Sequence, residues 1–433
     1  MYPMTRTKPR SQPDSQYQNA GNPPAGSKRL TIVHPTDPWD QGLGGFDTCL
    51  DGILRYAPDS WQIEFIGLST DPKSRPVGQW IEHKFGDRRI RFFAVLGDHD
   101  PDTVKPIPLS LRFALASRIR RVRSSGALVQ FHRFESALAV PLKQGQKPVH
   151  FLHNHPEEVD SVHSDVRWRR WGWLFRRMLR WKLSGAAGIV AVDPRTPDWV
   201  AGNLPCLNGR VMWLTQWADP TTFHLVGASE RFGAATRLKE QLGLPPATGL
   251  IGFVGRLERQ KDPFLILDSF AAIAPQKENV ALVIIGKGRL ESDLTLQSKA
   301  LGLAGRVRFI RPVHRQQLAD MYRAFDVVAC SSGFEAGPRV VFEALACGTP
   351  IVSFDVGQVR QVLGGDQPAQ VGELVRVRSA TAFSEAPLRA LAQPQTEERA
   401  RSCASAVKDH TPAVALGGLF ELYEASLRRY SRQ

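Results

Sequence analysis

The chain has 433 residues, of which 42% are hydrophobic and 23% charged, as in an ordinary soluble globular protein. This composition excludes wholesale disorder, and the length predicts two or three domains. The formal net charge of +14 favours an anionic partner: nucleic acid, a membrane surface or a phosphorylated substrate.

The amino-terminal stretch predicts a disordered tail over residues 1–29. It contains 15 Pro, Gln, Ser, Asn or Gly and lacks Leu, Ile, Val, Phe and Trp, so nothing in it offsets the entropy of ordering. No hydrophobic stretch follows its basic residues, and no apolar run in the chain reaches the roughly 18 residues of a membrane span. The sequence therefore predicts neither a secretory signal nor a transmembrane helix.

Two series of apolar runs follow and alternate with longer helical patterns. They are nearly continuous rather than alternating, which is typical of parallel strands covered on both faces. The first series comprises residues 30–33, 63–66, 90–95, 127–131, 149–153, 189–192 and 211–214, and the second comprises 250–254, 281–285, 307–310, 327–330 and 350–354.

The polar, broken stretch 218–246 separates the two series and predicts a domain junction. We therefore expect an α/β fold of two doubly wound, Rossmann-like domains in tandem, residues 30–217 and 247–412, with the substrate in the cleft between them. Residues 413–433 are expected to form a helix that packs back on the amino-terminal domain.

Residues 334–350 carry the most informative pattern. They follow a predicted strand, and Pro338 suits the first position of a helix that Gly348 would end. The amino end of such a helix is a favourable anion site. Glu335 lies in the preceding loop and Glu343 in the helix. Two glutamates alone are more typical of a solvated surface.

A second pattern follows the strand that ends at Val254. Gly255 allows close approach of the backbone, and Arg256 and Lys261 flank the loop. A guanidinium fork and an ammonium point charge at the carboxyl end of a strand suit a diphosphate. A basic surface loop is the alternative interpretation of this stretch alone.

Together these patterns resemble family 4 glycosyltransferases of the GT-B fold. The resemblance runs from Val254 to about Gly357 through Gly-Arg-Leu…Lys, residues 285–288, Asp326-Val327-Val328, and Glu-x7-Glu with Glu-Ala-Leu-Ala-Cys-Gly-Thr-Pro. It implies a retaining, metal-independent enzyme with no cofactor, which uses a nucleoside diphosphate sugar as substrate.

The resemblance also implies roles for single residues. Arg256 and Lys261 would hold the donor diphosphate, Glu343 the ribose hydroxyls, and Glu335 would face the transferred sugar as a catalytic residue. Gly337 would lie against the donor. Where the family usually has Glu-Gly-Phe-Gly, this chain has Glu335-Ala336-Gly337-Pro338, so the sequence does not name the sugar.

The amino-terminal half resembles the family more weakly. Residues 42–45 look like its glycine loop, in which Gly44 and Gly45 would approach donor phosphate. His153 is expected to be the active-site histidine, with His155 as the alternative. His132 suits a structural role better. The run Asp98-His99-Asp100 imitates a metal motif but lies in a polar loop, so no metal site is predicted.

Residues 167–182 hold seven cations, no acid and four of the ten Trp. At about 100° per residue this stretch predicts a helix with one apolar face for packing and one basic face. The basic face carries Arg169, Arg170, Trp173, Arg176, Arg177 and Arg180. With a second basic run over residues 112–123, it favours an anionic bilayer.

The sequence thus predicts a transferase that moves a sugar to a lipid-linked glycan or polysaccharide. We expect it to be cytoplasmic and peripheral on the inner face of the membrane. A nucleotide-sugar epimerase and a weakly catalytic membrane-bound subunit remain alternatives. The positive charge could also bind nucleic acid. However, the sequence has no helix-turn-helix, zinc finger or RNA-binding signature, so no nucleic-acid partner is predicted.

Overall fold

The computed structural model describes residues 28–40, 45–99, 105–160, 171–364 and 371–430. The chain divides into two compact units. The first comprises Met1–His153, Trp173–Leu214 and Leu416–Gln433, and the second comprises Asn154–Gly172 and Thr215–Ala415. Residues 1–27 of the expected tail lie outside the described residues, whereas Lys28 and Arg29 already belong to the first strand.

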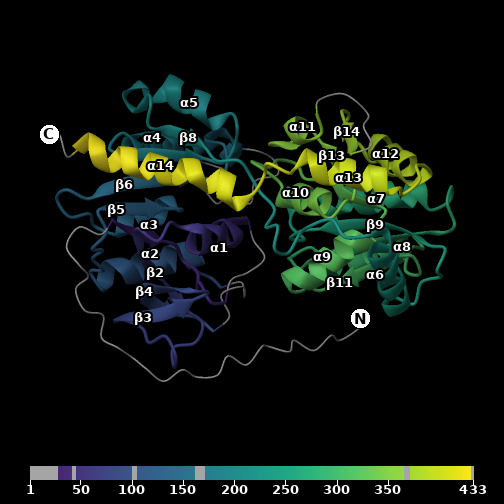
Figure 1. Ribbon diagram of the computed structural model, residues 1–433, viewed down its shortest axis with the longest axis horizontal. Coiled ribbons are helices and arrows are strands. Elements are labelled where there is room, and N and C mark those ends of the chain that lie inside the picture. Colours follow the sequence, from purple (N-terminus) through teal and green to yellow (C-terminus); the bar gives the residue numbers. More distant parts are fainter. Residues whose placement is uncertain (1–27, 41–44, 100–104, 161–170, 365–370, 431–433) are drawn as a thin grey trace. The chain divides into compact units, whose positions relative to one another are not determined.

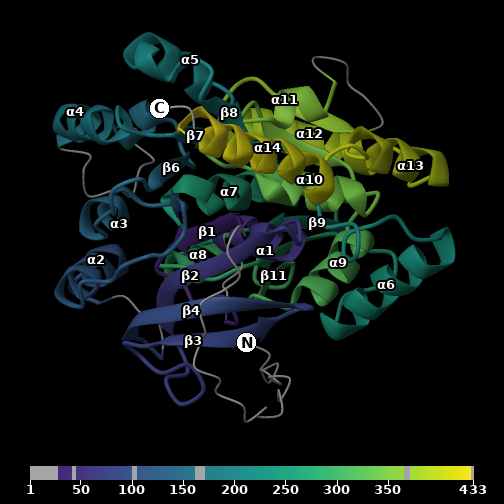
Figure 2. The same cartoon turned by 60° about the vertical axis from the view of Figure 1, so that its left-hand side comes forward.

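The first unit is built on a sheet of eight strands in the order β3-β4-β2-β1-β5-β6-β7-β8. All neighbouring pairs are parallel except β3 with β4, at one edge of the sheet (Figure 2). The strands are β1 Lys28–Val33, β2 Trp61–Ser69, β3 Trp80–Phe85, β4 Arg88–Gly97, β5 Leu128–Phe131, β6 Lys147–Leu152, β7 Gly188–Ala191 and β8 Val211–Trp213.

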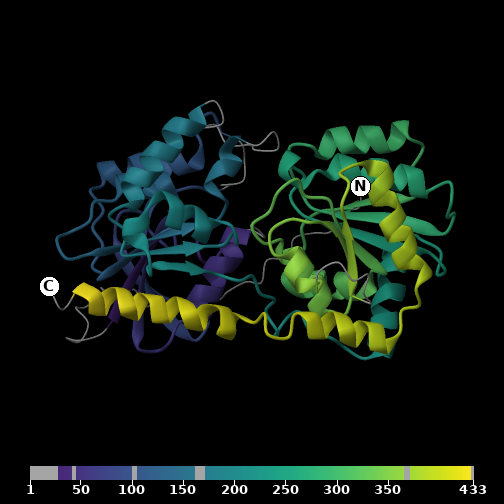
Figure 3. The same ribbon diagram turned by 90° about the horizontal axis from the view of Figure 1, so that it is seen from above.

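Helices cover both faces of this sheet. The helices are α1 Gly45–Tyr56, α2 Leu109–Ile119, α3 Phe134–Ala139, α4 Gly172–Leu183, α5 Thr196–Asn203 and α14 Pro412–Tyr430. Figure 3 shows α1 and α14 on one face and α2 with α3 on the other. The alternation along the strands agrees, because Val129 and Phe131 of β5 pack with Phe113 of α2, while Gln130 between them meets Tyr423 of α14.

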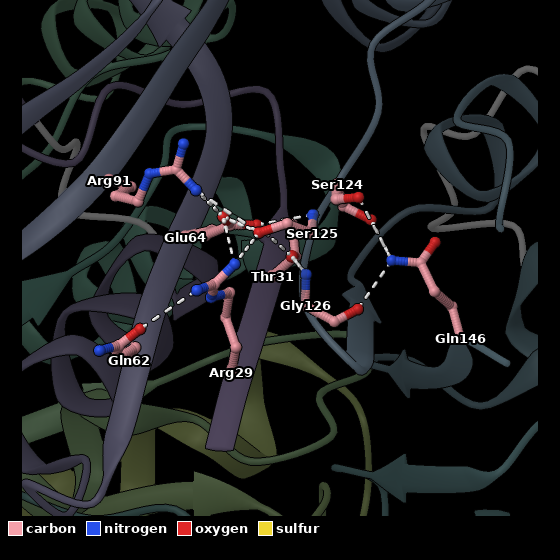
Figure 4. A network of polar contacts seen from close by, with 9 residues as sticks. All are labelled: Arg29, Thr31, Gln62, Glu64, Arg91, Ser124, Ser125, Gly126 and Gln146. Carbon is pink, nitrogen blue, oxygen red and sulfur yellow. Dashed lines mark hydrogen bonds and ion pairs between the residues drawn. The ribbon is translucent and has the colours of Figure 1, made fainter. Parts of the chain in front are cut away.

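Glu64 in the middle of β2 ties several strands of this sheet together (Figure 4). Its buried carboxylate accepts hydrogen bonds from Thr31 Oγ1 and the Ser125 amide, both at 2.9 Å, and pairs with the Arg91 guanidinium. A buried charge is tolerable only when it is paired in this way. Since Ser125 precedes β5, the network lies toward the amino ends of the strands and serves the sheet rather than a ligand.

The second unit has a parallel sheet of six strands in the order β11-β10-β9-β12-β13-β14. Its strands are β9 Gly249–Val254, β10 Val280–Ile285, β11 Val307–Ile310, β12 Val327–Cys330, β13 Ile351–Phe354 and β14 Gly372–Val375. Its helices are α6 Ala228–Gln241, α7 Pro263–Ile273, α8 Glu291–Ala300, α9 Arg315–Ala324, α10 Arg339–Ala346, α11 Val359–Val362, α12 Ala380–Ala392 and α13 Glu397–Ala406 (Figure 1).

Three local features differ from the sequence expectations. The stretch 218–246, expected as a junction, contains α6, which packs on α9 within the second unit. Strands β3 and β14 were not anticipated. Helix α10 begins at Arg339, so Pro338 is its N-cap rather than its first residue. Within the described residues, no helix is long and apolar enough to cross a membrane.

Candidate functional site

In the second unit, the loops that follow β9 and β12 are bound to each other. Gln260 joins them, because its carbonyl accepts from the Gly333 amide at 2.8 Å and its side-chain amide donates to the Phe334 carbonyl at 3.3 Å. Arg256, exposed in the first loop, donates from Nη2 to Gln260 Oε1 at 2.9 Å. Gln260 therefore orients Arg256 and holds the loop of Glu335 beside it, a role that no sequence signal indicated.

Lys261 and Glu335 form an ion pair, with Lys261 Nζ 2.5 Å from Glu335 Oε1. Both side chains are largely withdrawn from solvent, being 17% and 11% exposed. The sequence analysis assigned Lys261 to the donor diphosphate and Glu335 to the transferred sugar. In the structure these two side chains contact each other. An anion that binds Lys261 would share it with the carboxylate of Glu335.

Glu343 lies in the middle of α10 with its carboxylate buried. Tyr322 of α9 donates its hydroxyl to Glu343 Oε2 at 3.0 Å. Burial raises the pKa of the Glu343 carboxyl, while Arg339, Arg315 and the Tyr322 hydrogen bond act in the opposite direction. Such a carboxylate suits ligand hydroxyls, because it accepts several hydrogen bonds and nearby cations favour its charged form.

Gly337 stands where a larger residue would not fit. A Cβ built on it would lie 2.4 Å from Gln216 Cγ and 3.1 Å from Gln358 Nε2. Gln216 in turn accepts from Arg339 Nη1 at 3.3 Å, and the guanidinium lies over the Trp217 ring, 4.8 Å from its centroid. The glycine therefore lets the loop before α10 pack closely on the residues that hold its first turn.

Three histidines gather near the carboxyl ends of the strands in the first unit. His34 follows β1, His132 follows β5, and His153 follows β6. His132 Nδ1 is 2.8 Å from His153 Nε2, and the His34 ring lies edge-on to His132 at 5.5 Å between centroids. Burial and the positive charge of Arg133 lower the pKa of His153 to about 3.

The sequence singled out His153 but not His34, which no motif marks. His150 lies within β6, and burial lowers its pKa to about 3. His155, the alternative to His153, belongs to the second unit and is buried, with Nδ1 accepting from the Glu157 amide at 3.4 Å. That contact gives His155 a structural part in the turn that follows.

Other predicted residues are placed only in part. Gly45 begins α1, whereas Gly44 lies outside the described residues, as do Asp100, Arg169 and Arg170. Asp98 pairs with Lys105 and Arg112. Within the described residues, no group of three or more His, Cys, Asp or Glu could hold a metal ion.

Trp173 and Arg177 on α4 are exposed, as the predicted basic face requires, and Leu179 and Leu183 are buried. Arg176 is half-buried, and Arg180 donates to Asn203 Oδ1 of α5 at 3.1 Å. Trp171, which a helical period of about 100° per residue would place on the apolar face, is instead 56% exposed. It precedes the first helical residue, so the helical periodicity does not apply to it.

Comparison with known proteins decides the family. The model described as "Glycosyl transferases group 1" matches residues 235–408. Over 349 residues the chain is 31% identical to the D-inositol 3-phosphate glycosyltransferase of Corynebacterium urealyticum, covering 74% of this chain and 78% of that one. The chain belongs to the glycosyl transferases group 1 family. The predicted motif region, 254–357, falls inside the matched residues.

Other relatives match a shorter stretch of the chain. The D-inositol 3-phosphate glycosyltransferase of Xylanimonas cellulosilytica is 42% identical over 137 residues, and that of Rhodococcus erythropolis is 34% identical over 152. The chain spans about a third of the length of each, 32% and 34% respectively.

Solved structures confirm the predicted GT-B fold. Sucrose-phosphate synthase from Thermosynechococcus elongatus has a TM-score of 0.70 at 18% identity and covers 92% of this chain and 100% of its own. HepE of Anabaena, solved in complex with UDP-glucose, has a TM-score of 0.63 at 15% identity, covering 92% of this chain and 99% of its own. At these identities the likeness concerns the fold.

Proposed function

We propose that this protein transfers a sugar from a nucleoside diphosphate donor, which binds in the second unit. The observation that carries the proposal is the joined pair of loops with Arg256, Lys261 and Glu335, beside the buried carboxylate of Glu343. The cations suit a diphosphate, and the carboxylate suits the two hydroxyls of a ribose. Family membership and the UDP-glucose in the HepE structure support the same donor class.

In this proposal the transfer proceeds with retention, as the family resemblance implies. It needs no metal ion, because Arg256 and Lys261 would stabilise the leaving diphosphate in place of one. EDTA should then leave the rate unchanged. The epimerase alternative receives no support from the family or the relatives.

For the acceptor, we propose a phosphorylated polyol or sugar. The support comes from the names of the relatives, since the matched enzymes are D-inositol 3-phosphate glycosyltransferases. These names do not favour the lipid-linked glycan that the charge suggested. A cationic chain suits a phosphorylated acceptor equally well.

One experiment tests both proposals. Purified protein is incubated with radiolabelled UDP-, ADP- and GDP-sugars, each with inositol phosphate, a hexose phosphate, unphosphorylated inositol or a polyprenyl-linked glycan. We expect label to move from one donor class to a phosphorylated acceptor only. Transfer to the polyprenyl-linked glycan alone would overturn the acceptor proposal, and neither hydrolysis nor transfer with any donor would overturn the function.

We also propose that the first unit docks on an anionic membrane, at the cytoplasmic face, through α2, α3 and α4. A stripe of exposed aliphatic side chains, which the sequence analysis did not identify, favours this. Ile107, Leu111, Leu115 and Ile119 recur every four residues along and before α2, and Ile119 is 79% exposed. On α4, Trp173 and Trp181 are 61% and 68% exposed. Aliphatic and indole side chains together are typical of a bilayer interface.

The three helices form one continuous surface. Helix α2 packs on α3, and Phe134 of α3 contacts Phe175 of α4 with ring centroids 5.6 Å apart. Figure 2 shows the three helices side by side. Apart from Glu135 of α3, residues 105–139 and 171–192 carry no Asp or Glu. A second copy of this surface would therefore repel the first, and nucleic acid offers no apolar layer for the aliphatic stripe.

Vesicle sedimentation tests this docking. The double variant Arg118→Glu with Ile119→Glu should lose binding to anionic vesicles by about 30-fold or more, since each cation near such a surface contributes about 1 kcal/mol and a reversal counts twice. The matched control is Leu296→Glu with Lys299→Glu, an exposed pair on α8 of the second unit. Equal loss in both, or equal binding of wild type to neutral vesicles, would overturn the proposal.

A further inference from the structure

A chain of hydrogen bonds runs from helix α14 to the carboxyl end of β6 in the first unit. The Tyr423 hydroxyl donates to Gln130 Oε1, and Gln130 Nε2 meets His132 Nε2. His132 Nδ1 then lies 2.8 Å from His153 Nε2. Tyr423, Gln130 and His132 are buried, whereas His153 retains some exposed surface. The participants come from sequence positions up to 293 residues apart.

The chemistry of the groups fixes the direction of this chain. A side-chain amide nitrogen only donates, so His132 Nε2 must accept from Gln130. A neutral imidazole carries one proton, which in His132 must then be on Nδ1 and point at His153 Nε2. His153 Nε2 is thereby an acceptor, and the proton of its own ring is on Nδ1.

One observation favours this direction over its reverse. In the reverse arrangement the Gln130 amide would donate to the Tyr423 oxygen, and the tyrosine proton would need another acceptor. Among the described residues, Gln130 is the only hydrogen-bond partner recorded for the Tyr423 hydroxyl, which is buried. Both directions require neutral rings, and burial lowers the pKa of both His132 and His153.

We propose that Tyr423, acting through Gln130 and His132, holds His153 in the tautomer with its proton on Nδ1. Tyr423 is thus a positioning residue in a helix that follows the second unit in sequence. His153 then offers a hydrogen-bond donor rather than a base. A ligand that contacts Nδ1 of His153 must present a hydrogen-bond acceptor, such as a hydroxyl or phosphate oxygen. Only this statement about a ligand rests on the proposed function.

The tautomer can be measured without any substrate. Full-length protein with ¹⁵N-labelled histidine is examined by long-range ¹H–¹⁵N correlation at pH 7, and the His153→Gln variant assigns the ring signals. We expect a pyrrole-type shift for Nδ1 and a pyridine-type shift for Nε2 of His153. A protonated Nε2 with a bare Nδ1 would overturn the proposed direction, whatever the result of the transfer assay.

Tyr423→Phe removes the hydroxyl and keeps the ring. We expect it to shift His153 from one tautomer to a mixture of both. Without the Tyr423 hydroxyl, the Gln130 side-chain amide can flip and exchange the positions of Oε1 and Nε2. Tyr322→Phe is the matched control: it is another buried tyrosine that loses one hydrogen bond, but it lies in the second unit. An unchanged His153 signature in Tyr423→Phe would overturn the role of Tyr423. If that variant does not fold, the wild-type spectrum still decides the direction.

Discussion

Replacing Glu343 by Gln should weaken the binding of bare nucleoside diphosphate. The change keeps the shape of the side chain, and the amide oxygen can still accept the Tyr322 hydroxyl that lies 3.0 Å from Oε2 in the wild type. The variant loses the negative charge to which the ribose hydroxyls would donate their hydrogen bonds. A hydrogen bond to a charged group contributes about 1.5–3 kcal/mol and a neutral one about 0.5–1.5, so each ribose hydroxyl loses about 1–1.5 kcal/mol. One or two such bonds predict a loss of about ten- to a hundredfold in affinity.

The pH dependence gives the same prediction a second readout. Burial raises the pKa of Glu343, and the protonated carboxyl resembles the amide of the variant. Wild-type affinity should therefore fall as the pH is lowered through this raised pKa, while the E343Q variant should lack that step. Isothermal titration with UDP, ADP and GDP between pH 5 and 8 measures both effects.

Glu335→Gln serves as the matched control, because Glu335 is assigned to the transferred sugar rather than to the ribose. It should lower turnover while changing affinity for bare nucleotide far less. Equal losses of nucleotide affinity in the two variants would refute the assignment of Glu343 to the ribose. A pH step that persists in E343Q would show that another group titrates.

Three further predictions concern single residues. Arg256→Ala should reduce nucleoside diphosphate affinity by about one to two decades, because a charge-assisted contact contributes about 1.5–3 kcal/mol; unchanged affinity by calorimetry would remove Arg256 from the site. Gly337→Ala should destabilise the fold by about 1–3 kcal/mol, since its Cβ would overlap Gln216, whereas Gly202→Ala in open space should not; denaturant unfolding compares the two. A thiol reagent at pH 8 should label Cys206 first, because the other four cysteines are buried and burial raises the pKa of Cys347 to about 12; mass spectrometry after brief labelling identifies the modified residue.

Much of the fold could be predicted because strands that are buried on both faces appear in the sequence as continuous apolar runs. The run 281–285 became β10, all of whose residues are buried. Strand β3 was not predicted, because it pairs antiparallel at the edge of the sheet and has no continuous apolar run. The polar residues Glu82 and Lys84 interrupt its apolar residues. Strand β14 is short and begins with a glycine, Gly372, and its first residues are only half-buried. Edge strands carry the weakest sequence signal.

In the candidate site, too, some residues could be predicted from the sequence and others could not. Arg256, Lys261, Glu335 and Glu343 could be found because they lie within about ninety residues at spacings shared by a family. Gln260 and Tyr322 could not, because each acts through one contact that depends on how loops and helices meet. Tyr423 was even less accessible, since its partner Gln130 is 293 residues away. Its place on the packing face of the last helix was predictable, but its hydrogen bond was not.

The ion pair of Lys261 with Glu335 limits what single replacements can reveal about this site. If Lys261 is removed, the largely buried carboxylate of Glu335 loses its ion-pair partner. A defect in Lys261→Met would then combine a lost diphosphate contact with an unpaired carboxylate at Glu335. Conversely, Glu335→Gln removes the charge that Lys261 faces, and we expect it to slow transfer while changing the affinity for bare nucleotide little. Because the two residues are in contact, their effects should not add, and the double variant measures the coupling between them.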